Sequence, residues 1–400
     1  MNIVIQKATA CGTIKAQPSK SMAHRYIICA MLSEGESRIR GLAESEDILA
    51  TMDCARALGA ELKKDGEDLL VRGISDRKPA GEIVFSCRES GSTMRFFMGI
   101  AMGLGCRARF YGSRTLLQRP FSVYEEIAKR QGITFVRNED HILVDGKLQP
   151  GDFEIPGDVS SQFISGLLFV LPLLEKDSRI VLLPPVESRS YIDLTLQALR
   201  DFGVCVENDL SIGGKQSYRC NTIDVEGDMS NAAFPDALNL LGGSVKITGL
   251  SADSSQGDRV YREYFQKLRE GDACLDLTDC PDLGPVLFAV AACLHGGTFT
   301  GTRRLKMKES DRGTVMCEEL AKCGVGTHME DDSVRILPSV LHAPDQNLLG
   351  HNDHRIVMAL SVILTRTGGT IEGAQAVSKS YPTFFDDLKS LGIPLERVES

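Results

Sequence analysis

Six short segments of this chain place polar or charged side chains where an apolar helix is expected to begin. They are SKSMAHR (19–25), ESGSTMR (89–95), VSSQF (159–163), DMSNAAF (228–234), CPDLGP (280–285) and NDHR (352–355). The first turn of a helix leaves backbone N–H groups without partners and carries partial positive charge, so it is a ready site for anions. Six such helix starts would suit a ligand, or a pair of ligands, with several negative charges.

Cations, hydroxyls and two carboxylates recur at equivalent places in these segments and in the loops that follow them. At the helix starts they are Lys20, Ser21, Arg25, Ser90, Gly91, Ser92, Ser160, Ser161, Gln162, Asp282, His354 and Arg355. In the loops they are Arg114, Arg119, Ser188, Tyr191, Lys306, Lys308, Glu309, Arg312 and Lys379. Lys and Arg hold phosphates and carboxylates through charge-assisted hydrogen bonds, and a turn of small residues lets backbone N–H groups approach a ligand.

Each segment also has a plainer interpretation. A serine before a helix is most often a simple N-cap, and the charged run at residues 308–312 could be capping with solvated charges. His351 and His354 lie three residues apart without carboxylate or cysteine partners at ligand spacing, so no metal site is expected. There is no P-loop or dinucleotide fingerprint. Because unusual polar residues recur at one structural place in five of the six segments, we favour a binding site over chance capping.

The elements around these segments form a repeat with a period of roughly 54 to 72 residues. An apolar helix follows most segments, then a turn and a β-like run, then an amphipathic helix that usually ends on glycine before further strands. Each repeat therefore reads β-α-β-α-β-β. First helices such as residues 25–32 are so apolar that they must be buried on nearly all sides, whereas second helices such as residues 122–130 carry a polar face and should lie outside.

The repeat count predicts two domains. Three repeats precede residue 226 and three follow it, and the opening strand at residues 2–6 is expected to pair with the last repeat. We predict one domain at residues 14–225 and a second formed by residues 1–13 with 226–400. The active site would lie in the cleft between them.

Bulk composition narrows the class of protein. Of 400 residues, 42% are apolar and 25% are charged, an ordinary globular balance. The net charge of −9 argues against a nucleic-acid surface, so an anionic ligand must meet a local basic cluster. No segment approaches the ~20 apolar residues of a membrane span, and no secretory signal is visible. Twelve cysteines without a CxxC pair indicate reduced thiols, so we expect a cytoplasmic protein. We also expect it to be a monomer.

Eight motifs in order resemble the 5-enolpyruvylshikimate-3-phosphate synthase (3-phosphoshikimate 1-carboxyvinyltransferase) family: SKSMAHR, SGSTMR, LLQRP, VSSQF, SRSYIDLTL, KESDR, NDHR and SKSYPTFF. The resemblance implies an α/β (α+β) fold, a two-domain inside-out α/β barrel with six βαβαββ repeats, three per domain, and helices buried inside. It also implies transfer of the enolpyruvyl group of phosphoenolpyruvate to the 5-hydroxyl of shikimate 3-phosphate, with release of phosphate. This is a step of the shikimate pathway to chorismate and the aromatic amino acids, and it needs no cofactor or metal.

The same resemblance implies roles for individual residues. The shikimate 3-phosphate site would comprise Lys20, Ser21, Arg25, Ser160, Ser161, Gln162, Ser188, Tyr191, Asp282 and Lys308. The phosphoenolpyruvate site would comprise Lys20, Gly91, Arg119, Gln162, Arg312, Arg355 and Lys379. Asp282, Glu309 and Lys20 would be catalytic, with Glu309 as the main proton carrier at the methylene carbon and Asp282 as the second carboxylate. The partners would be these two small molecules, with no nucleic acid and no membrane.

Two alternatives can be weighed against the sequence. A related transferase acting on a UDP-amino sugar typically has a reactive cysteine in the loop at residues 113–119, which has none here. A non-catalytic sugar-phosphate binding protein would need the cations but not both Asp282 and Glu309. The chain departs from the commonest family pattern at Arg88 and Glu89, where many members have Gly-Asn, and at Phe96 and Arg304, where proline or leucine and asparagine are frequent.

Overall fold

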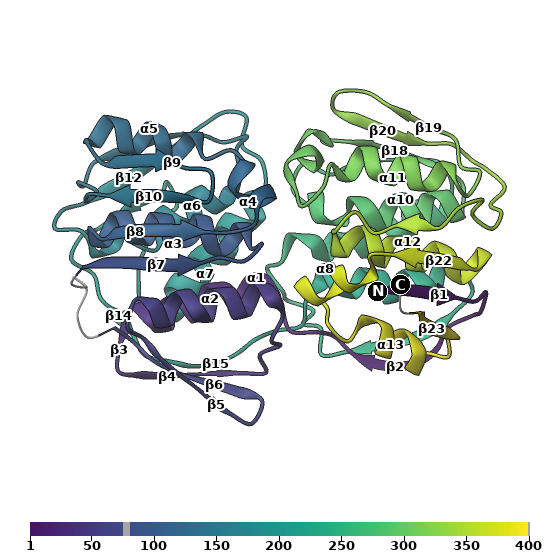
Figure 1. The fold of residues 1–400 in the computed structure, drawn as a ribbon, viewed down its shortest axis with the longest axis horizontal. Coiled ribbons are helices and arrows are strands. Elements are labelled where there is room, and N and C mark those ends of the chain that lie inside the picture. The colour runs from purple at the N-terminus through teal and green to yellow at the C-terminus, as the bar shows by residue number, and fades with distance from the viewer. Residues whose placement is uncertain (75–80, 399–400) are drawn as a thin grey trace. The chain divides into compact units, whose positions relative to one another are not determined.

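The computed structural model describes residues 1–74 and 81–398 and divides into two compact units (Figure 1). The N-terminal unit comprises residues 18–226, and the C-terminal unit comprises residues 1–17 with residues 227–400. Each unit has its own buried hydrophobic cluster. The chain passes from one unit to the other after Gln17 and again after Glu226.

The helices described in the N-terminal unit are α1 (Lys20–Leu32), α2 (Glu46–Ala57), α3 (Gly91–Leu104), α4 (Arg114–Gln118), α5 (Ser122–Gln131), α6 (Ser161–Leu168), η1 (Leu171–Leu173) and α7 (Arg189–Asp201). Its strands are β3 (Ser33–Glu34), β4 (Glu36–Arg40), β5 (Glu61–Asp65), β6 (Asp68–Arg72), β7 (Glu82–Ser86), β8 (Arg107–Tyr111), β9 (Thr134–Arg137), β10 (His141–Asp145), β11 (Asp152–Pro156), β12 (Ser178–Leu183), β13 (Ser211–Ile212), β14 (Tyr218–Arg219) and β15 (Thr222–Asp224).

The helices described in the C-terminal unit are α8 (Met229–Leu240), η2 (Gly257–Val260), α9 (Tyr261–Glu270), η3 (Pro281–Leu283), α10 (Gly284–Cys293), η4 (Arg303–Met307), α11 (Arg312–Ala321), α12 (His354–Thr367), η5 (Ala374–Lys379) and α13 (Phe384–Ser390). Its strands are β1 (Asn2–Ile5), β2 (Cys11–Lys15), β16 (Ser244–Thr248), β17 (Ala273–Asp276), β18 (Gly297–Thr300), β19 (Thr327–Met329), β20 (Ser333–Ile336), β21 (Leu348–Leu349), β22 (Gly369–Glu372) and β23 (Leu395–Val398).

The second repeat shows the predicted βαβαββ order most completely. Its sheet has the order β7-β8-β10-β9, with β7 and β8 parallel across α3 and the hairpin β9–β10 antiparallel after α5. Alternation along β7 buries Ile83 and Phe85, so one face of this sheet packs inward. The sheet β17-β18-β20-β19 repeats the same order. In the sixth repeat β1 lies between β22 and β23 and is antiparallel to both, which confirms the predicted pairing of the opening strand.

Two repeats exchange their first strands. β2 precedes α1 in the chain but pairs in parallel with β16, from Cys11 opposite Ser244 to Lys15 opposite Thr248. β15 precedes α8 but pairs in parallel with β4. The fourth repeat also departs from the uniform pattern, because only two residues separate α9 from β17 and leave no room for a hairpin. The third has a three-stranded sheet, β11-β12-β13.

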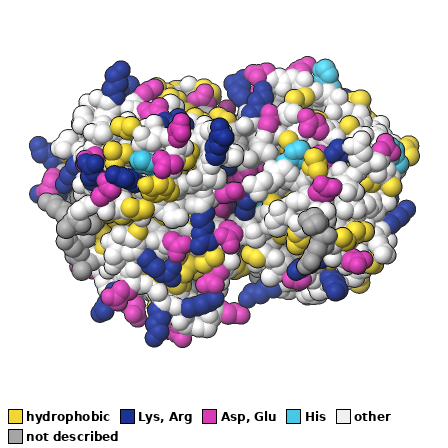
Figure 2. Space-filling view, viewed as in Figure 1, with side chains coloured by type: hydrophobic (Ala, Val, Ile, Leu, Met, Phe, Trp, Pro, Cys, Tyr) yellow, Lys and Arg dark blue, Asp and Glu magenta, His cyan; other side chains and the backbone are white. Residues whose placement is uncertain are grey.

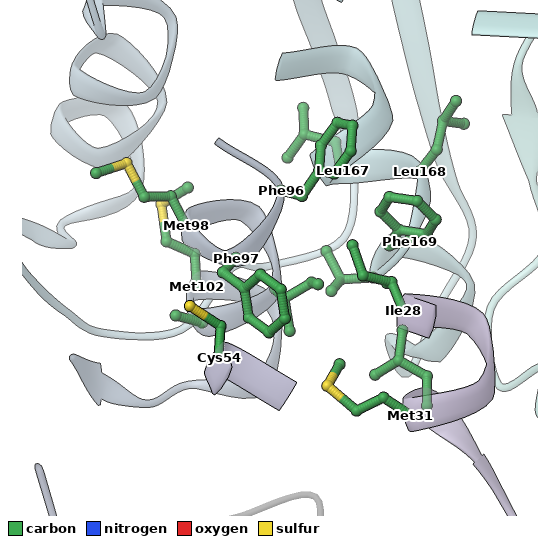
Figure 3. Packing of buried hydrophobic residues seen from close by; sticks show 14 of the residues in the cluster. Ile28, Met31, Cys54, Phe96, Phe97, Met98, Met102, Leu167, Leu168 and Phe169 are labelled. Atoms are coloured by element: carbon green, nitrogen blue, oxygen red, sulfur yellow. The ribbon is translucent and has the colours of Figure 1, made fainter. Parts of the chain in front are cut away.

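The first helices of the repeats form the core, as their apolar sequences predicted. Every residue of α1 from Met22 to Leu32 is buried, and α3 is buried almost throughout. Figure 3 shows side chains of α1, α2, α3 and α6 packed against one another. Helices α3 and α6 approach closely at glycines, since a Cβ on Gly99 would lie 2.6 Å from the carbonyl carbon of Gly166. The second helix α5 instead exposes Ser122 and Lys129, as predicted.

Candidate functional site

All six polar segments start helical structure in the way the sequence predicted. Side-chain oxygens of Ser19, Ser90, Ser160, Asp228 and Asp353 accept hydrogen bonds from backbone N–H groups in the first turns of α1, α3, α6, α8 and α12. The CPDLGP segment forms the 3-10 turn η3, which leads directly into α10. The capping interpretation therefore holds, and the remaining question is what the other side chains do.

In the N-terminal unit, Arg25 joins α1 to α7. Its Nε donates to Thr195 Oγ1 at 2.8 Å, its Nη2 to the carbonyl of Tyr191 at 2.9 Å and its Nη1 to the carbonyl of Ser21 at 2.7 Å. The guanidinium lies 5.4 Å from the ring centroid of Phe96. Burial lowers the pKa of Arg25 to about 10, which still leaves the side chain charged at neutral pH. The structure thus brings three predicted residues, Ser21, Arg25 and Tyr191, together.

A second group in the same unit surrounds the small-residue turn at the start of α3. A Cβ built on Gly91 would lie 2.8 Å from Arg119 Nη1, 3.3 Å from Arg95 Nη1 and 3.8 Å from Gln162 Oε1. Arg95 Nη1 donates to Gln162 Oε1 at 2.6 Å, and Gln162 Nε2 donates to Ser92 Oγ at 2.8 Å. Gly91, Arg119 and Gln162, all predicted from the sequence, are therefore neighbours. Two guanidinium groups facing a glycine turn can hold an anion by charge-assisted hydrogen bonds.

Other predicted residues of the N-terminal unit lie at helix starts. Lys20 Nζ pairs with Asp47 Oδ2 of α2 at 2.9 Å, with both side chains mostly buried. Ser161 opens α6 and is buried, and Ser160 caps it by accepting from the backbone N–H of Gln162 at 3.4 Å. Ser188 is fully buried and has a φ of +54°, a left-handed conformation that costs a non-glycine residue energy and is enriched at functional sites.

In the C-terminal unit, the buried guanidinium of Arg312 joins three carboxylates. It is 1% exposed and donates from Nε to Asp353 at 2.8 Å, from Nη1 to Asp282 at 2.8 Å and from Nη2 to Glu309 at 2.6 Å. The three partners come from the starts of α12 and η3 and from the loop after η4. The planar fork of arginine is suited to three such bonds in fixed directions. Asp282 of the CPDLGP segment is thus brought together with Glu309 and Arg312 of the KESDR motif, all three predicted from the sequence.

Asp282 is surrounded by cations. Lys308 Nζ lies 3.0 Å from its Oδ1, and Arg355 Nη2 lies 3.1 Å from its Oδ2. Burial opposes ionisation of this carboxyl, but Arg355, Lys308 and Arg312 together hold its pKa well below the usual range. Burial also lowers the pKa of Lys308, while the negative charge of Asp282 acts in the opposite direction. Asp282 is therefore an ionised hydrogen-bond acceptor at neutral pH.

Lys379 is fixed beside the turn that precedes α12. Its Nζ donates to the carbonyl of Asn352 at 2.6 Å. His351 and Asn352 have φ values of +48° and +52°, so two consecutive non-glycine residues adopt the left-handed conformation. Glu319, 1% exposed, pairs with His351 Nε2 at 2.8 Å and thereby holds the turn. The predicted residues Lys379 and Arg355 thus sit on either side of one strained turn.

Several residues of these clusters were not singled out from the sequence as site residues. Arg95 completes the turn at Gly91, Asp353 orients Arg312, and Asp47 pairs with Lys20. Arg95 had a visible signal, since it ends the SGSTMR motif as Arg25 ends SKSMAHR. Arg88, a departure from the family pattern, pairs with Asp53 on α2 at 2.8 Å.

Three other observations bear on the class of protein. Among residues 1–74 and 81–398, no group of three or more His, Cys, Asp or Glu side chains could hold a metal ion. None of the helices described has the length and apolar character needed to cross a bilayer. On the face shown in Figure 2, Lys and Arg side chains are interspersed with Asp and Glu. An anionic ligand would therefore depend on local clusters such as the two above.

Comparison with known proteins gives matches along the whole chain. The family model for EPSP synthase (3-phosphoshikimate 1-carboxyvinyltransferase) matches residues 5–388. A protein of Clostridium perfringens named 3-phosphoshikimate 1-carboxyvinyltransferase is 38% identical over 416 residues and covers 98% of each chain. A protein of the same name from Clostridium kluyveri is 39% identical over 414 residues and covers 95% of each.

Solved structures agree on the architecture. An EPSP synthase from Acinetobacter baumannii has a TM-score of 0.80 at 22% identity and covers 100% of both chains. The enolpyruvyl transferase NikO from Streptomyces tendae has a TM-score of 0.81 at 14% identity and covers 100% of this chain and 99% of its own. At these identities the likeness shows the fold alone, and it confirms the predicted inside-out α/β architecture.

Proposed function

Because this chain belongs to the EPSP synthase (3-phosphoshikimate 1-carboxyvinyltransferase) family, we propose that it transfers the enolpyruvyl group of phosphoenolpyruvate to the 5-hydroxyl of shikimate 3-phosphate and releases phosphate. The family match over residues 5–388 carries the proposal. The geometry supports it, since residues that separate motifs assign to the substrates lie together within each unit. The twelve free cysteines fit a reducing compartment, so the enzyme is proposed to act in the cytoplasm. We also propose that it acts as a monomer.

In the proposed assignment, the cluster of the N-terminal unit supplies positive charge and hydroxyls. Lys20, Ser21, Arg25, Ser160, Ser161, Ser188 and Tyr191 would hold shikimate 3-phosphate. Gly91 and Arg119 would hold phosphoenolpyruvate, with Gln162 between the two substrates. Donors that stay charged and are fixed before the ligand arrives are the groups that bind phosphate and carboxylate well.

The C-terminal unit supplies the carboxylates that proton transfer needs. Glu309 would give a proton to the methylene carbon of phosphoenolpyruvate, which leaves a cationic centre at the adjacent carbon. The 5-hydroxyl oxygen then attacks that carbon while Asp282 accepts the hydroxyl proton. In the second step a proton returns from the new methyl group to Glu309, the double bond re-forms, and phosphate leaves with the proton that Asp282 had accepted. Arg312, Arg355, Lys308 and Lys379 would stabilise the anionic groups of both steps.

Phosphate release tests this proposal directly. The purified protein should release phosphate from phosphoenolpyruvate only when shikimate 3-phosphate is present, and UDP-N-acetylglucosamine should not replace it. Formation of 5-enolpyruvylshikimate 3-phosphate should match phosphate release mole for mole. Release that requires the UDP-sugar, or no release with either acceptor, would overturn the proposal.

A further inference from the structure

A continuous chain of buried hydrogen bonds runs beneath the Gly91 turn. His24 Nδ1 lies 2.7 Å from Thr51 Oγ1, Thr51 Oγ1 lies 2.7 Å from Thr93 Oγ1, and Thr93 Oγ1 donates to Ser90 Oγ at 2.8 Å. All four side chains are at most 1% exposed. They belong to α1, α2, and the N-cap and first turn of α3, so the chain crosses three helices of one unit.

Each end of this chain lies beside a candidate substrate group. Ser90 caps α3 immediately before Gly91, and its Oγ also accepts the backbone N–H of Thr93 at 3.3 Å. His24 is one turn of α1 beyond Lys20. Thr93 Oγ1 also lies 3.4 Å from the carbonyl of Asp47, whose side chain pairs with Lys20. The chain therefore links the glycine turn to the helix that carries Lys20.

The donor inventory fixes the direction of the chain. A threonine hydroxyl has one hydrogen, and the hydrogen of Thr93 goes to Ser90, the nearer of its two acceptors. Thr51 must then donate to Thr93, which leaves Nδ1–H of His24 to donate to Thr51. His24 Nε2 is buried without a hydrogen-bond partner, and a bare ring nitrogen there costs less than an unpaired N–H. The neutral imidazole with its proton on Nδ1 satisfies every step.

We propose that His24, Thr51 and Thr93 are positioning residues for the proposed enolpyruvyl transfer. They fix the position of the Ser90–Gly91 turn relative to α1, the helix that carries Lys20. The kinetic consequence of this inference rests on the proposed function, whereas the chain of hydrogen bonds does not. A buried polar chain with every step satisfied specifies one arrangement of its helices more strictly than apolar packing does. Burial, with Lys20 and Arg25 nearby, holds the pKa of His24 well below its usual value, so the chain keeps its neutral form across physiological pH.

Thr51→Val tests the chain, because it keeps the shape of the side chain and removes the hydroxyl. We expect KM for phosphoenolpyruvate to rise about tenfold, the change that one hydrogen bond of ordinary strength represents, with a smaller effect on KM for shikimate 3-phosphate. Thr51→Ser restores the hydroxyl and should restore KM. The matched control is Thr365→Val on α12, since Thr365 is 2% exposed and its hydroxyl donates only within its own helix, to the carbonyl of Val362.

A spectroscopic measurement tests the chain without relying on turnover. In protein labelled with ¹⁵N-histidine, His24 should show a protonated Nδ1 and a neutral ring at neutral pH. Thr51→Val should remove that tautomer preference, and Thr51→Ser should keep it. If Thr51→Val does not fold, Thr93→Val breaks the next link and carries the same kinetic prediction, while His24 keeps Thr51 Oγ1 as its hydrogen-bond partner and should keep its tautomer.

The outcomes separate this inference from the proposed function. If the wild-type protein releases no phosphate, the proposed function is wrong. The histidine spectrum still decides whether the chain of hydrogen bonds from His24 to Ser90 exists. An active wild type whose Thr51→Val variant keeps its KM for phosphoenolpyruvate overturns the positioning role. Equal kinetic losses in Thr51→Val and Thr365→Val would also overturn it, because a general loss of packing would then explain both. A protonated Nε2 on His24 would overturn the direction of the chain.

Discussion

Replacing Arg312 with lysine keeps the charge at the centre of the C-terminal cluster and removes the shape of the guanidinium. Arg312 is 1% exposed and bonds Asp353, Asp282 and Glu309 from three different nitrogens. A lysine ammonium is a compact point charge and cannot reach three carboxylates that were placed around a planar fork. Arg312→Lys therefore leaves at least two of these carboxylates without their arginine bond.

The structure sets the size of the expected loss. A hydrogen bond to a charged group contributes about 1.5–3 kcal/mol. Breaking a buried ion pair costs about 3–5 kcal/mol of unfolding free energy, and this is the loss we expect. In a unit of about 190 residues, this predicts a fall in Tm of roughly 6 to 20 °C. We expect turnover to fall as well, because Arg312 is a proposed substrate group.

The loss should also depend on pH in a defined direction. The folded-state pKa of Asp282 is depressed, so its stabilisation is present above the unfolded value of about 3.9 and is lost as pH falls through the folded value. Arg312→Lys weakens one of the causes of that depression and raises the folded pKa. The gap in stability between wild type and variant should therefore be full at pH 7 and narrow below about pH 4.

Urea denaturation at pH 7 and at several acidic values measures this gap. Arg335→Lys is the matched control, because Arg335 is 46% exposed and pairs with Asp272 at 2.8 Å on the surface. Its expected loss is within about 0.5 kcal/mol, as for most exposed ion pairs. The reasoning fails if Arg312→Lys costs no more than the control, or if the gap widens as the pH falls.

Three further substitutions test other parts of the site. Glu309→Gln should lower turnover by about 10²–10⁴-fold with little change in affinity for shikimate 3-phosphate. The control Glu318→Gln, on the exposed side of α11, should leave turnover unchanged. Near-normal turnover of Glu309→Gln would remove Glu309 from the mechanism. Gly91→Ala puts a methyl group 2.8 Å from Arg119 Nη1 and should raise KM for phosphoenolpyruvate more than KM for shikimate 3-phosphate; unchanged values for both would place the turn away from the substrates. Burial first, then Asp282, raises the pKa of Asp258 to about 6, so its ionised form destabilises the fold at neutral pH. Asp258→Asn should therefore raise the free energy of unfolding, measured with urea at pH 7, by up to about 3 kcal/mol and change it little at pH 4. An equal effect at both pH values would contradict this.

The helix starts were predictable because capping is local chemistry. A serine or aspartate at the N-cap accepts a hydrogen bond from an N–H group two or three residues away. Ser19, Ser90 and Asp353 therefore predict from the sequence alone where their helices begin. The exchange of β2 and β15 was not predictable, since the pairing of Cys11 with Ser244 depends on contacts more than two hundred residues apart. The alternation of apolar and polar residues shows which face of a strand is buried, but it does not show which other strand pairs with it.

The candidate site was also predictable only in part from the sequence. Motifs named the cations and the carboxylates Asp282 and Glu309, and the structure adds which of them touch. Asp353 belongs to the NDHR helix start and caps α12, and the same carboxylate also holds Arg312. Its second role was invisible because it depends on how α11 and α12 pack. The buried chain from His24 to Ser90 was hidden for the same reason, as single threonines on separate helices carry no pattern.

The charges of the two clusters differ in a way that bears on their roles. In the C-terminal unit the cations Lys308, Arg312 and Arg355 face the carboxyl groups of Asp282, Glu309 and Asp353. These six side chains are formally neutral together while Glu309 is ionised, and they carry one positive charge once Glu309 holds the proton that it transfers. Their positions are fixed by one another before any substrate arrives, which favours catalysis by groups that need not reorganise.

In the N-terminal unit the buried guanidinium of Arg25 bonds neutral acceptors. Arg25 donates to a hydroxyl and to carbonyls, and Arg95 donates to the amide oxygen of Gln162. The positive charge of Arg25 is therefore less compensated than that of Arg312, although Lys20 is paired with Asp47. A dianionic phosphate gains more from charge that no carboxylate has already neutralised. This difference supports the proposal that the N-terminal unit holds the shikimate phosphate, while the neutral cluster of the C-terminal unit serves proton transfer.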